Sequence, residues 1–256
     1  MALAPSLAGK AALVTGASAG LGRRMATVLA AHGATVAIAA RRRDRLDVVA
    51  AEIAEQGGHA VPVQLDTADP GSIDAAVAEA EAALGPLHIL VNNAATQRIG
   101  WLMDQDEADW DALVDTNVKG CWLMSRTVAR RMVANGTGGS IVNISSLLAF
   151  RHQKMVGAYG TTKAAIVHLT QAMALEWAQH GIRVNGIAPG NVITDMTREY
   201  LTSPHGQGMI RKIPLRRFGE PDDMDGPLLL LAGEGGRYMT GVVIPVDGGH
   251  TLSLAL

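Results

Sequence analysis

The stretch from Lys10 to Gly22, Lys-Ala-Ala-Leu-Val-Thr-Gly-Ala-Ser-Ala-Gly-Leu-Gly, runs from an apolar segment into a turn that holds three glycines. Residues 10–15 predict a buried strand, and residues 21–32 have the apolar period of a helix. Glycines at 16, 20 and 22 permit a sharp turn without Cβ atoms, and the helix behind them offers free N–H groups and a favourable dipole. This strand, turn and helix predict a pyrophosphate-binding site.

Short apolar runs alternate with helical segments along the rest of the chain. We expect strands at 35–40, 59–65, 89–92, 140–144, 183–188 and 242–246, and helices at 43–56, 70–84, 106–135 with a break near Thr116, 157–180 and 222–232. This alternation predicts an α/β fold, a Rossmann-type doubly wound parallel sheet of about seven strands with helices on both faces. No boundary interrupts the pattern, so residues 1–256 are expected to form a single dinucleotide-binding and catalytic domain.

One connection departs from this alternation. About thirty residues, 191–221, separate a predicted strand from the next helix, whereas connections in such folds usually have only a few residues. The segment carries apolar side chains of its own, Met196, Tyr200, Leu201, Met209 and Ile210. A long connection of this kind is typical of a lid, so we expect residues 191–221 to cover a substrate.

The composition excludes several classes of function. The 256 residues include 22 Lys or Arg and 24 Asp or Glu, a net charge of −2, which gives no basic surface for nucleic acid or for an anionic membrane. None of the eight histidines has a metal-binding spacing, and no apolar run is long enough to span a membrane. The lone Cys121 and an N-terminus unlike a signal peptide predict a reducing, cytoplasmic setting.

The end of the second predicted strand indicates which dinucleotide the turn accepts. Ile38-Ala-Ala40 is followed by Arg41-Arg42-Arg43, whereas NAD-binding folds place a carboxylate there for the ribose hydroxyls. Arginines instead match a 2′-phosphate by charge and by fork geometry. We expect NADP(H) in preference to NAD(H), with Arg41 on the phosphate and Ser18 and Arg42 assisting. The alternative is that these arginines are only the solvated start of a helix.

Residues 143–163 carry groups that can move a proton. Tyr159 and Lys163 are four residues apart and share one face of a helix. A lysine cation beside a phenol favours the phenolate, so we expect Lys163 to lower the pKa of Tyr159 from its usual value of about 10. Ser146 ends a predicted strand thirteen residues before Tyr159, where its hydroxyl can hold a carbonyl oxygen. Ser145 is the competing candidate.

These motifs together resemble the short-chain dehydrogenase/reductase family, in the single-domain form typical of ketoreductases. The resemblance covers nearly the whole chain, and the motifs follow the family's order: the glycine turn, Asp66, Asn92-Asn93-Ala94, Asn117, Ser146, Tyr159 with Lys163, Pro189-Gly190 and Val246-Asp-Gly-Gly249. It implies an NAD(P)H-dependent oxidoreductase that interconverts a ketone or aldehyde and an alcohol by hydride transfer, with Tyr159 as general acid/base.

The resemblance also implies a role for each matching residue. Ser146 orients the carbonyl, Lys163 binds the nicotinamide ribose, and Asn117 holds the water of a proton relay. Asp66 meets the adenine, Asn93 the ribose, and residues 189–194 the nicotinamide carboxamide. The full set of implied cofactor contacts is Gly16, Ser18, Gly20, Leu21, Gly22, Arg41, Arg42, Asp66, Thr67, Asn93, Ala94, Tyr159, Lys163, Pro189, Gly190, Val192 and Thr194.

Two residues depart from the family pattern. Ala95 stands where the family usually has Gly, which adds a methyl group near the cofactor or substrate, and we expect the site to tolerate it. Ala19 stands where many NADPH-preferring members carry Arg or Lys. The expected preference for NADPH therefore depends on Arg41 and Arg42.

The substrate pocket and the subunit contacts are predicted in outline. A moderately apolar set is expected to line the pocket: Thr96, Leu147, Leu148, Gln153, Val156, Met196 and Tyr200. The helix at 158–177 is apolar almost all round, although a helix on a sheet needs only one apolar stripe, so the excess indicates burial against another subunit. The resemblance implies a homotetramer.

Three alternative functions remain open. A 3-oxoacyl-carrier or CoA thioester reductase needs a basic docking surface, to which Arg130 and Arg131 can contribute, but His180 stands where many carrier reductases have Arg. A sugar or polyol dehydrogenase is a close rival. A cofactor-binding scaffold or redox sensor predicts loss of Ser146, Tyr159 or Lys163, and all three are present.

Overall fold

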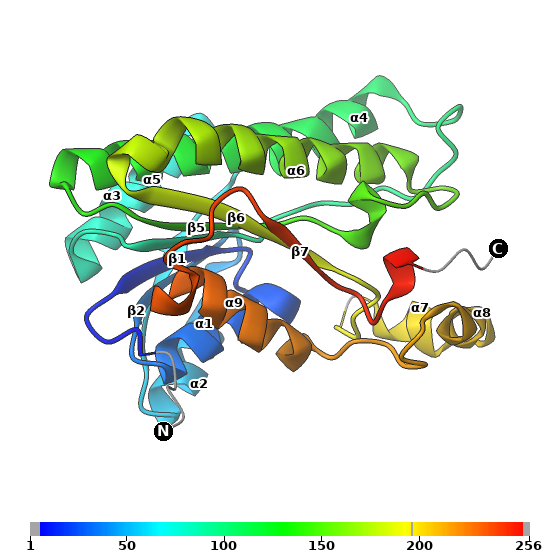
Figure 1. Cartoon of the computed structure of the whole chain (residues 1–256), viewed down its shortest axis with the longest axis horizontal. Coiled ribbons are helices and arrows are strands. Elements are labelled where there is room, and N and C mark those ends of the chain that lie inside the picture. The colour runs from blue at the N-terminus through cyan, green and yellow to red at the C-terminus, as the bar shows by residue number, and fades with distance from the viewer. Residues whose placement is uncertain (1–5, 196, 253–256) are drawn as a thin grey trace.

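The predicted parallel sheet is present in the computed structural model, which describes residues 6–195 and 197–252. Its seven strands are β1 (Ala11–Thr15), β2 (Thr35–Ala40), β3 (His59–Gln64), β4 (Ile89–Asn92), β5 (Gly139–Ile144), β6 (Ile182–Pro189) and β7 (Val243–Val246). They lie in the order β3-β2-β1-β4-β5-β6-β7 (Figure 1). The chain reverses its direction of travel across the sheet between β1 and β4, which is where doubly wound sheets open a ligand crevice.

Helices cover both faces of this sheet (Figure 1). One face carries α1 (Gly20–Ala31), α2 (Arg43–Glu55) and α9 (Asp225–Ala232), and the other carries α3 (Pro70–Leu84), α4 (Glu107–Val114), α5 (Gly120–Asn135) and α6 (Gly157–Trp177). Along β1, Ala12 and Val14 enter the first core, and Ala11 and Leu13 enter the second. Because both faces are covered, every residue of β1 is buried, and the predicted fold class is confirmed.

The long helix predicted at 106–135 is interrupted close to Thr116, as expected. Between the end of α4 and the start of α5, residues Asp115–Lys119 form a π-helical turn. The turn places Asn117 in the interior, with only 2% of its surface exposed. Gly120 lets the start of α5 lie close to the turn that follows β3, because a Cβ at residue 120 would lie 2.5 Å from the carbonyl oxygen of Thr67. Isolated π turns of this kind often occur at functional sites.

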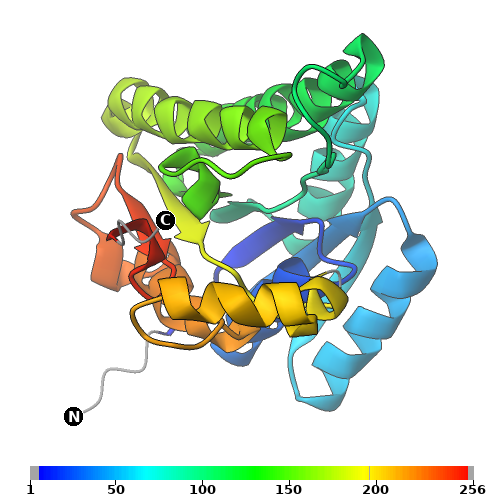
Figure 2. The ribbon, with the colours of Figure 1, turned by 90° about the vertical axis from the view of Figure 1, so that its right-hand side faces the viewer.

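The long connection at 191–221 is an ordered segment with a small core. It contains α7 (Arg198–Thr202) and α8 (Pro204–Met209), and Leu201, Ile213 and Phe218 form its small core. Backbone hydrogen bonds from Ile193 N to Gly219 O (2.8 Å) and from Gly219 N to Asn191 O (2.9 Å) join its two ends. Figure 2 faces the carboxyl ends of the strands and shows both short helices lying across this edge, opposite α6.

The outer face of α6 carries exposed apolar side chains, as the sequence suggests. Ile166 and Met173 are buried against the sheet, whereas Ala164 and Leu175 are exposed, the latter by 84%. On the neighbouring α5, Trp122 is also partly exposed. Within residues 6–195 and 197–252, no helix is both long and apolar enough to cross a membrane.

Candidate active site

The four residues expected to be catalytic meet at the carboxyl edge of the sheet. Ser146 follows β5, Asn117 lies in the π turn, and Tyr159 and Lys163 occupy the first two turns of α6. The Lys163 ammonium donates to the carbonyl of Ile144 (2.9 Å), at the end of β5. The Asn117 amide donates to the hydroxyl of Thr162 (3.0 Å), which lies between Tyr159 and Lys163. The strand end, the π turn and the start of α6 therefore form one site.

The two neighbouring serines have different surroundings. Ser145 is 3% exposed, and its hydroxyl donates to the backbone carbonyl of Lys163 (2.9 Å). Ser146 caps the following 3-10 turn by accepting from the N–H of Leu148 (3.2 Å) and forms a hydrogen bond with Tyr159. The hydroxyl of Ser146 therefore lies beside the phenol, while that of Ser145 joins β5 to α6.

The expectation that Lys163 lowers the Tyr159 pKa is wrong for the protein alone. Burial raises the pKa of Tyr159 to about 12, and the hydrogen bond with Ser146 acts in the opposite direction. The Lys163 ammonium lies 5.5 Å from the centre of the Tyr159 ring, but its hydrogen bond goes to Ile144. Burial also lowers the pKa of Lys163 to about 8, against an opposing effect of Cys121. Desolvation outweighs the pairing that the sequence suggests.

Lys163 gives a pH dependence of stability that can be measured. Its folded pKa of about 8 lies below its usual 10.5, so between pH 8 and 9 the unfolded chain binds more protons and stability rises with pH. We expect the free energy of unfolding to increase by about 1 kcal/mol over this interval. Above pH 9 the rise in stability should fade. Burial raises the pKa of the Cys121 thiol to about 12, so the folded chain keeps a proton there that the unfolded chain loses, and this lowers the stability as pH rises.

Urea denaturation at pH 8, 8.5 and 9 measures this slope. The Lys163→Met variant should lose this rise because it lacks the titrating ammonium. A flat wild-type profile, or an unchanged slope in the variant, would contradict the burial of a titrating ammonium at this position.

Asn117 is fully engaged with the protein. Its side-chain oxygen accepts from the N–H of Thr96 (2.8 Å), and its amide donates to the carbonyl of Thr96 (2.9 Å) and to Thr162. Both amide hydrogens are therefore used, and the side chain fixes the loop after β4 against α6. The relay water expected at Asn117 stays a prediction, and the side-chain amide has no hydrogen left to donate to it.

The glycine turn follows β1 as predicted, but its glycines serve different contacts. A Cβ on Gly22 would lie 2.3 Å from the carbonyl oxygen of Gly16, and one on Gly16 would lie 2.9 Å from the Cα of Ala94. These two glycines therefore let the turn pack on itself and on the end of β4. Gly20, at φ +55°, has Thr194 as its neighbour, 3.7 Å from the position of a Cβ. It brings the glycine turn next to the segment after β6.

Asn93 holds the glycine turn in place. Its amide donates to the carbonyls of Thr15 (3.0 Å) and Gly16 (3.2 Å), and its own N–H donates to the Thr15 hydroxyl (3.0 Å). Its donors are thus directed at the turn rather than outward to a ribose. Asp66 likewise accepts from the N–H of Ala68 (3.0 Å), which shapes the turn after β3.

The turn and its surroundings fit an anionic dinucleotide. Ala19 stands at the N-cap of α1 and provides no side-chain cap, and the first turn of the helix holds no acidic residue. The N–H groups at this end of α1 therefore stay unpaired. Arg42 donates to the Ser18 hydroxyl (3.4 Å), which joins the end of β2 to the turn. Arg41 is exposed and has no ion pair with any described residue.

Arg43 fits the alternative interpretation, in which the arginines only form the solvated start of a helix. This side chain pairs with Asp47 (3.3 Å) and Glu79 (3.7 Å). Ala95, which stands where the family usually has glycine, is exposed.

The predicted substrate residues are only partly brought together. Leu148, Gln153 and Val156 line a small cavity beside the start of α6, with Gly157 and Gly160 on either side of Tyr159. Leu147 is buried, and Tyr200 lies on α7 with its hydroxyl on the sulfur of Met209 (3.5 Å). Met196 lies outside the described residues.

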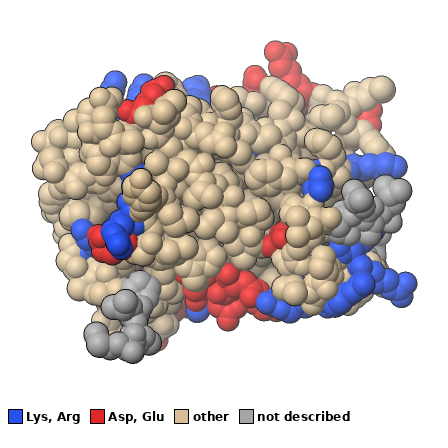
Figure 3. Space-filling model, viewed as in Figure 1, with Lys and Arg blue, Asp and Glu red and all other residues tan. Residues whose placement is uncertain are grey.

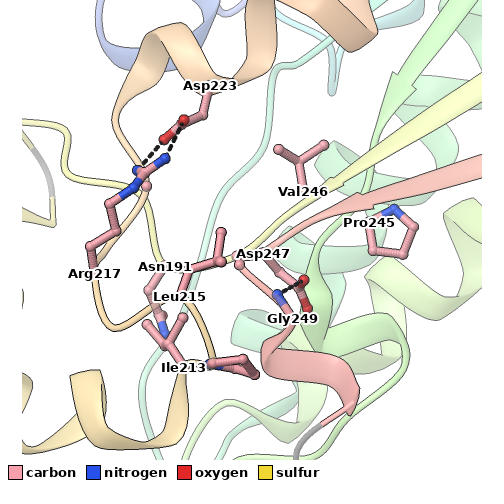
Figure 4. Close-up of a pocket in the computed structure, with 13 residues that line it drawn as sticks. Asn191, Ile213, Leu215, Arg217, Asp223, Pro245, Val246, Asp247 and Gly249 are labelled. Carbon is pink, nitrogen blue, oxygen red and sulfur yellow. Dashed lines mark hydrogen bonds and ion pairs between the residues drawn. The ribbon is translucent and has the colours of Figure 1, made fainter.

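A larger cavity, of about 420 Å³, was not anticipated (Figure 4). It lies between the end of β7 and the base of the long connection, and it includes Gly190 and Asn191 after β6. Arg217 and Asp223 form an ion pair on one wall (2.6 Å). None of Ser146, Tyr159 and Lys163 lines it. Its residues come from three distant segments. The motifs Pro189-Gly190 and Val246-Asp-Gly-Gly249 mark two of them, but nothing in the sequence indicates that the three segments enclose one cavity.

Comparison with known proteins identifies the class. The sequence model described as short chain dehydrogenase matches residues 10–204. The chain is similar to a gluconate 5-dehydrogenase of Gluconobacter oxydans (36% identity over 250 residues, covering 97% of each chain). It is also similar to a 3-oxoacyl-acyl-carrier-protein reductase of Staphylococcus aureus (36% over 241 residues, 94% of this chain and 97% of that one). A crystal structure of a gluconate 5-dehydrogenase from Burkholderia cenocepacia in complex with NADP and tartrate has a TM-score of 0.93 at 33% identity, with coverage of 97% and 98%.

The fold and these relatives define an oxidoreductase that uses NAD(P) to interconvert carbonyl compounds and alcohols. The chain belongs to the short-chain dehydrogenase family.

Proposed function

We propose that this enzyme is an NADPH-preferring carbonyl reductase or alcohol dehydrogenase in which Ser146, Tyr159 and Lys163 carry out the proton chemistry. The observation that carries the proposal is the meeting of Ser146 and the Tyr159 phenol at the end of β5, with the buried Lys163 ammonium one turn along α6. Three groups of these types at one strand end can hold a carbonyl oxygen and supply it with a proton.

The residues divide the work as follows. Ser146 donates a hydrogen bond that orients the carbonyl, and Tyr159 gives its proton to the carbonyl oxygen. The raised pKa of Tyr159 keeps the phenol protonated at neutral pH, which is the form that reduction requires. Lys163 holds a positive charge in the interior next to this phenol and binds the ribose of the cofactor. The nicotinamide cofactor, when bound, supplies or accepts the hydride.

The cofactor is proposed to lie along the glycine turn, with its adenosine 2′-phosphate at Arg41 and Arg42. The free N-terminus of α1 and the contact of Arg42 with Ser18 support this placement. The similar Burkholderia enzyme that was solved with NADP supports the same preference. Gly190, Val192 and Thr194 follow β6, and Thr194 lies beside Gly20. This segment would receive the nicotinamide end.

Three further proposals concern the whole protein. Residues 191–221 act as a substrate lid within one domain, since they fold over the carboxyl edge around their own small core. The exposed Leu175 and Trp122 on α6 and α5 support contact between subunits of a homotetramer. The single cysteine, Cys121, is free and buried, as suits a cytoplasmic protein.

The similar gluconate 5-dehydrogenases favour a sugar-derived substrate as the second candidate. A carrier-bound substrate has less support, because Arg130 and Arg131 lie near the end of α5, toward the edge of the sheet opposite Ser146 and Tyr159. Oxidation of NADPH in the presence of ketones, aldehydes, keto sugars and β-ketoacyl thioesters distinguishes these substrates.

The Arg41→Ala variant tests the cofactor preference. Removing a side chain that meets the 2′-phosphate should raise the KM for NADPH about 10- to 100-fold, by analogy with other charge-assisted contacts. The KM for NADH, which lacks that phosphate, should change less than about twofold. Arg43→Ala is the matched control, because Arg43 is already paired with acidic residues. Equal or better turnover of the wild type with NADH would overturn the preference.

A further inference from the structure

Basic residues are concentrated in the two segments that face each other across the active-site edge. The long connection at 191–221 holds five Lys or Arg residues and three Asp or Glu residues, and the segment 147–156 after β5 holds two basic residues and no acidic one. The rest of the chain has six more acidic than basic residues, given the totals of 22 and 24. The nearly neutral net charge therefore conceals two segments with an excess of basic residues.

Six of these side chains are exposed and form no ion pair with the residues that the structure describes. They are Arg151, Lys154, Arg198, Arg211, Lys212 and Arg216, which we name the basic rim. Arg23, Arg24 and Arg98, by contrast, each pair with a carboxylate. Figure 3 shows basic side chains gathered at the end of the molecule where α7 and α8 lie.

The basic rim comes from two segments that lie at the same edge of the sheet as Ser146 and Tyr159. Arg151 lines the small cavity that contains Gly157 and Gly160, the neighbours of Tyr159 in the first turns of α6. Arg211 and Lys212 belong to the 3-10 turn Ile210–Lys212, which follows α8, and the next residue, Ile213, lines the larger cavity.

We propose that the substrate is a small anion, a carbonyl compound or its alcohol that carries a carboxylate, and that the basic rim draws it into the site. Unpaired cations around a cleft focus the field and raise the encounter rate of an anion by about 10- to 1000-fold at low salt. Charges act over about 8 Å at physiological ionic strength, so the effect is confined to ligands at this edge. The proposal rests on the proposed function, because it concerns the substrate of the same site.

The double variant Arg211→Gln/Lys212→Gln tests the proposal. These residues are exposed and lie outside the catalytic and cofactor-binding sets, so the fold and the chemical step should be unaffected. The matched control is Arg130→Gln/Arg131→Gln, which removes the same charge from exposed positions near the end of α5. The probes are the best carboxylate-bearing ketone of the substrate panel and the methyl ester of that ketone, at saturating cofactor and at low and high salt.

We expect kcat/KM for the carboxylate to fall about 5- to 10-fold in the rim variant at low salt, through KM and not through kcat. The ester should change less than twofold, and the control variant should resemble the wild type with both probes. In the wild type, kcat/KM for the carboxylate should decrease as salt is added, whereas kcat/KM for the ester should not. Equal effects on the two probes, or no salt dependence with the carboxylate, would overturn the proposal.

Binding of gluconate and of its uncharged analogue glucitol to the enzyme with oxidised cofactor gives a readout that does not need turnover. Calorimetry should show that gluconate binds more tightly than glucitol and that the rim variant loses this difference. Equal affinities would contradict the anionic substrate even if ketones are reduced. A failure to reduce any ketone, or turnover by Tyr159→Phe, would instead contradict the proposed chemistry. Stronger dependence on Arg130 and Arg131 with carrier-bound thioesters would favour a protein partner.

Discussion

Replacement of Tyr159 by Phe should lower kcat for ketone reduction by about 1000-fold, the middle of the range for a positioned general acid. The phenol is the group that lies against Ser146 at the end of β5, and phenylalanine keeps the ring while it removes the proton donor. NADPH binding, measured by fluorescence, should change little because the ring and Lys163 remain. The melting temperature should also stay close to that of the wild type.

Tyr238→Phe is the matched control for this result. It removes the same hydroxyl from a tyrosine that is fully exposed, so its kcat should equal that of the wild type. In the direction of alcohol oxidation the wild-type rate should rise with pH, because burial raises the pKa of Tyr159 and the basic form accumulates only in alkaline solution. Turnover by Tyr159→Phe within tenfold of the wild type would remove Tyr159 from the proposed role.

Replacement of Gly22 by Ala should both destabilise the protein and weaken cofactor binding. The added methyl group would lie 2.3 Å from the Gly16 carbonyl oxygen and 2.5 Å from the Asn93 amide nitrogen, and neither the turn backbone nor the bound amide can move freely. We expect a loss of about 3 kcal/mol in the free energy of unfolding, at the upper end for overpacking. The affinity for NADPH should fall at least tenfold because the turn opens, and urea denaturation and fluorescence titration measure the two effects.

Gly226→Ala provides the comparison for Gly22. A Cβ on Gly226 meets nothing within 4 Å, and the residue lies in α9, so alanine should be neutral or stabilise the protein by up to about 1 kcal/mol. If both variants behave alike, the close packing at Gly22 does not govern the turn.

The fold could be predicted from the sequence because its signals are local and repeat along the chain. Apolar runs such as residues 10–15 and 35–40 mark strands that are buried on both faces, and the glycines mark the turn between β1 and α1. The break near Thr116 was also visible. Its π-helical form was not, because that form depends on the contact of Gly120 with Thr67 and on the burial of Asn117.

The site could be predicted as a set of residues but not as a set of contacts. Order and spacing indicated Ser146, Tyr159 and Lys163, yet the direction of the Tyr159 pKa depends on burial, which the spacing of two residues does not reveal. The amides of Asn93 and Asn117 turned out to hold backbone segments. Their partners, Thr15 and Thr96, are 78 and 21 residues away, and hydrogen bonds at such separations follow only from the folded chain.

The reversal of chain direction between β1 and β4 also sets an order of events during synthesis. β1 pairs with β4 through Ala12 and Ile89, so the central pair cannot form before residue 92 has been made. Tyr159 follows 67 residues later, a delay of about 3 to 13 seconds at about 5–20 residues per second on the ribosome. The nascent chain thus contains the elements that shape the glycine turn, including Asn93, well before the proton donor exists. The part of the chain proposed to bind the cofactor is therefore synthesised several seconds before the part that supplies the proton.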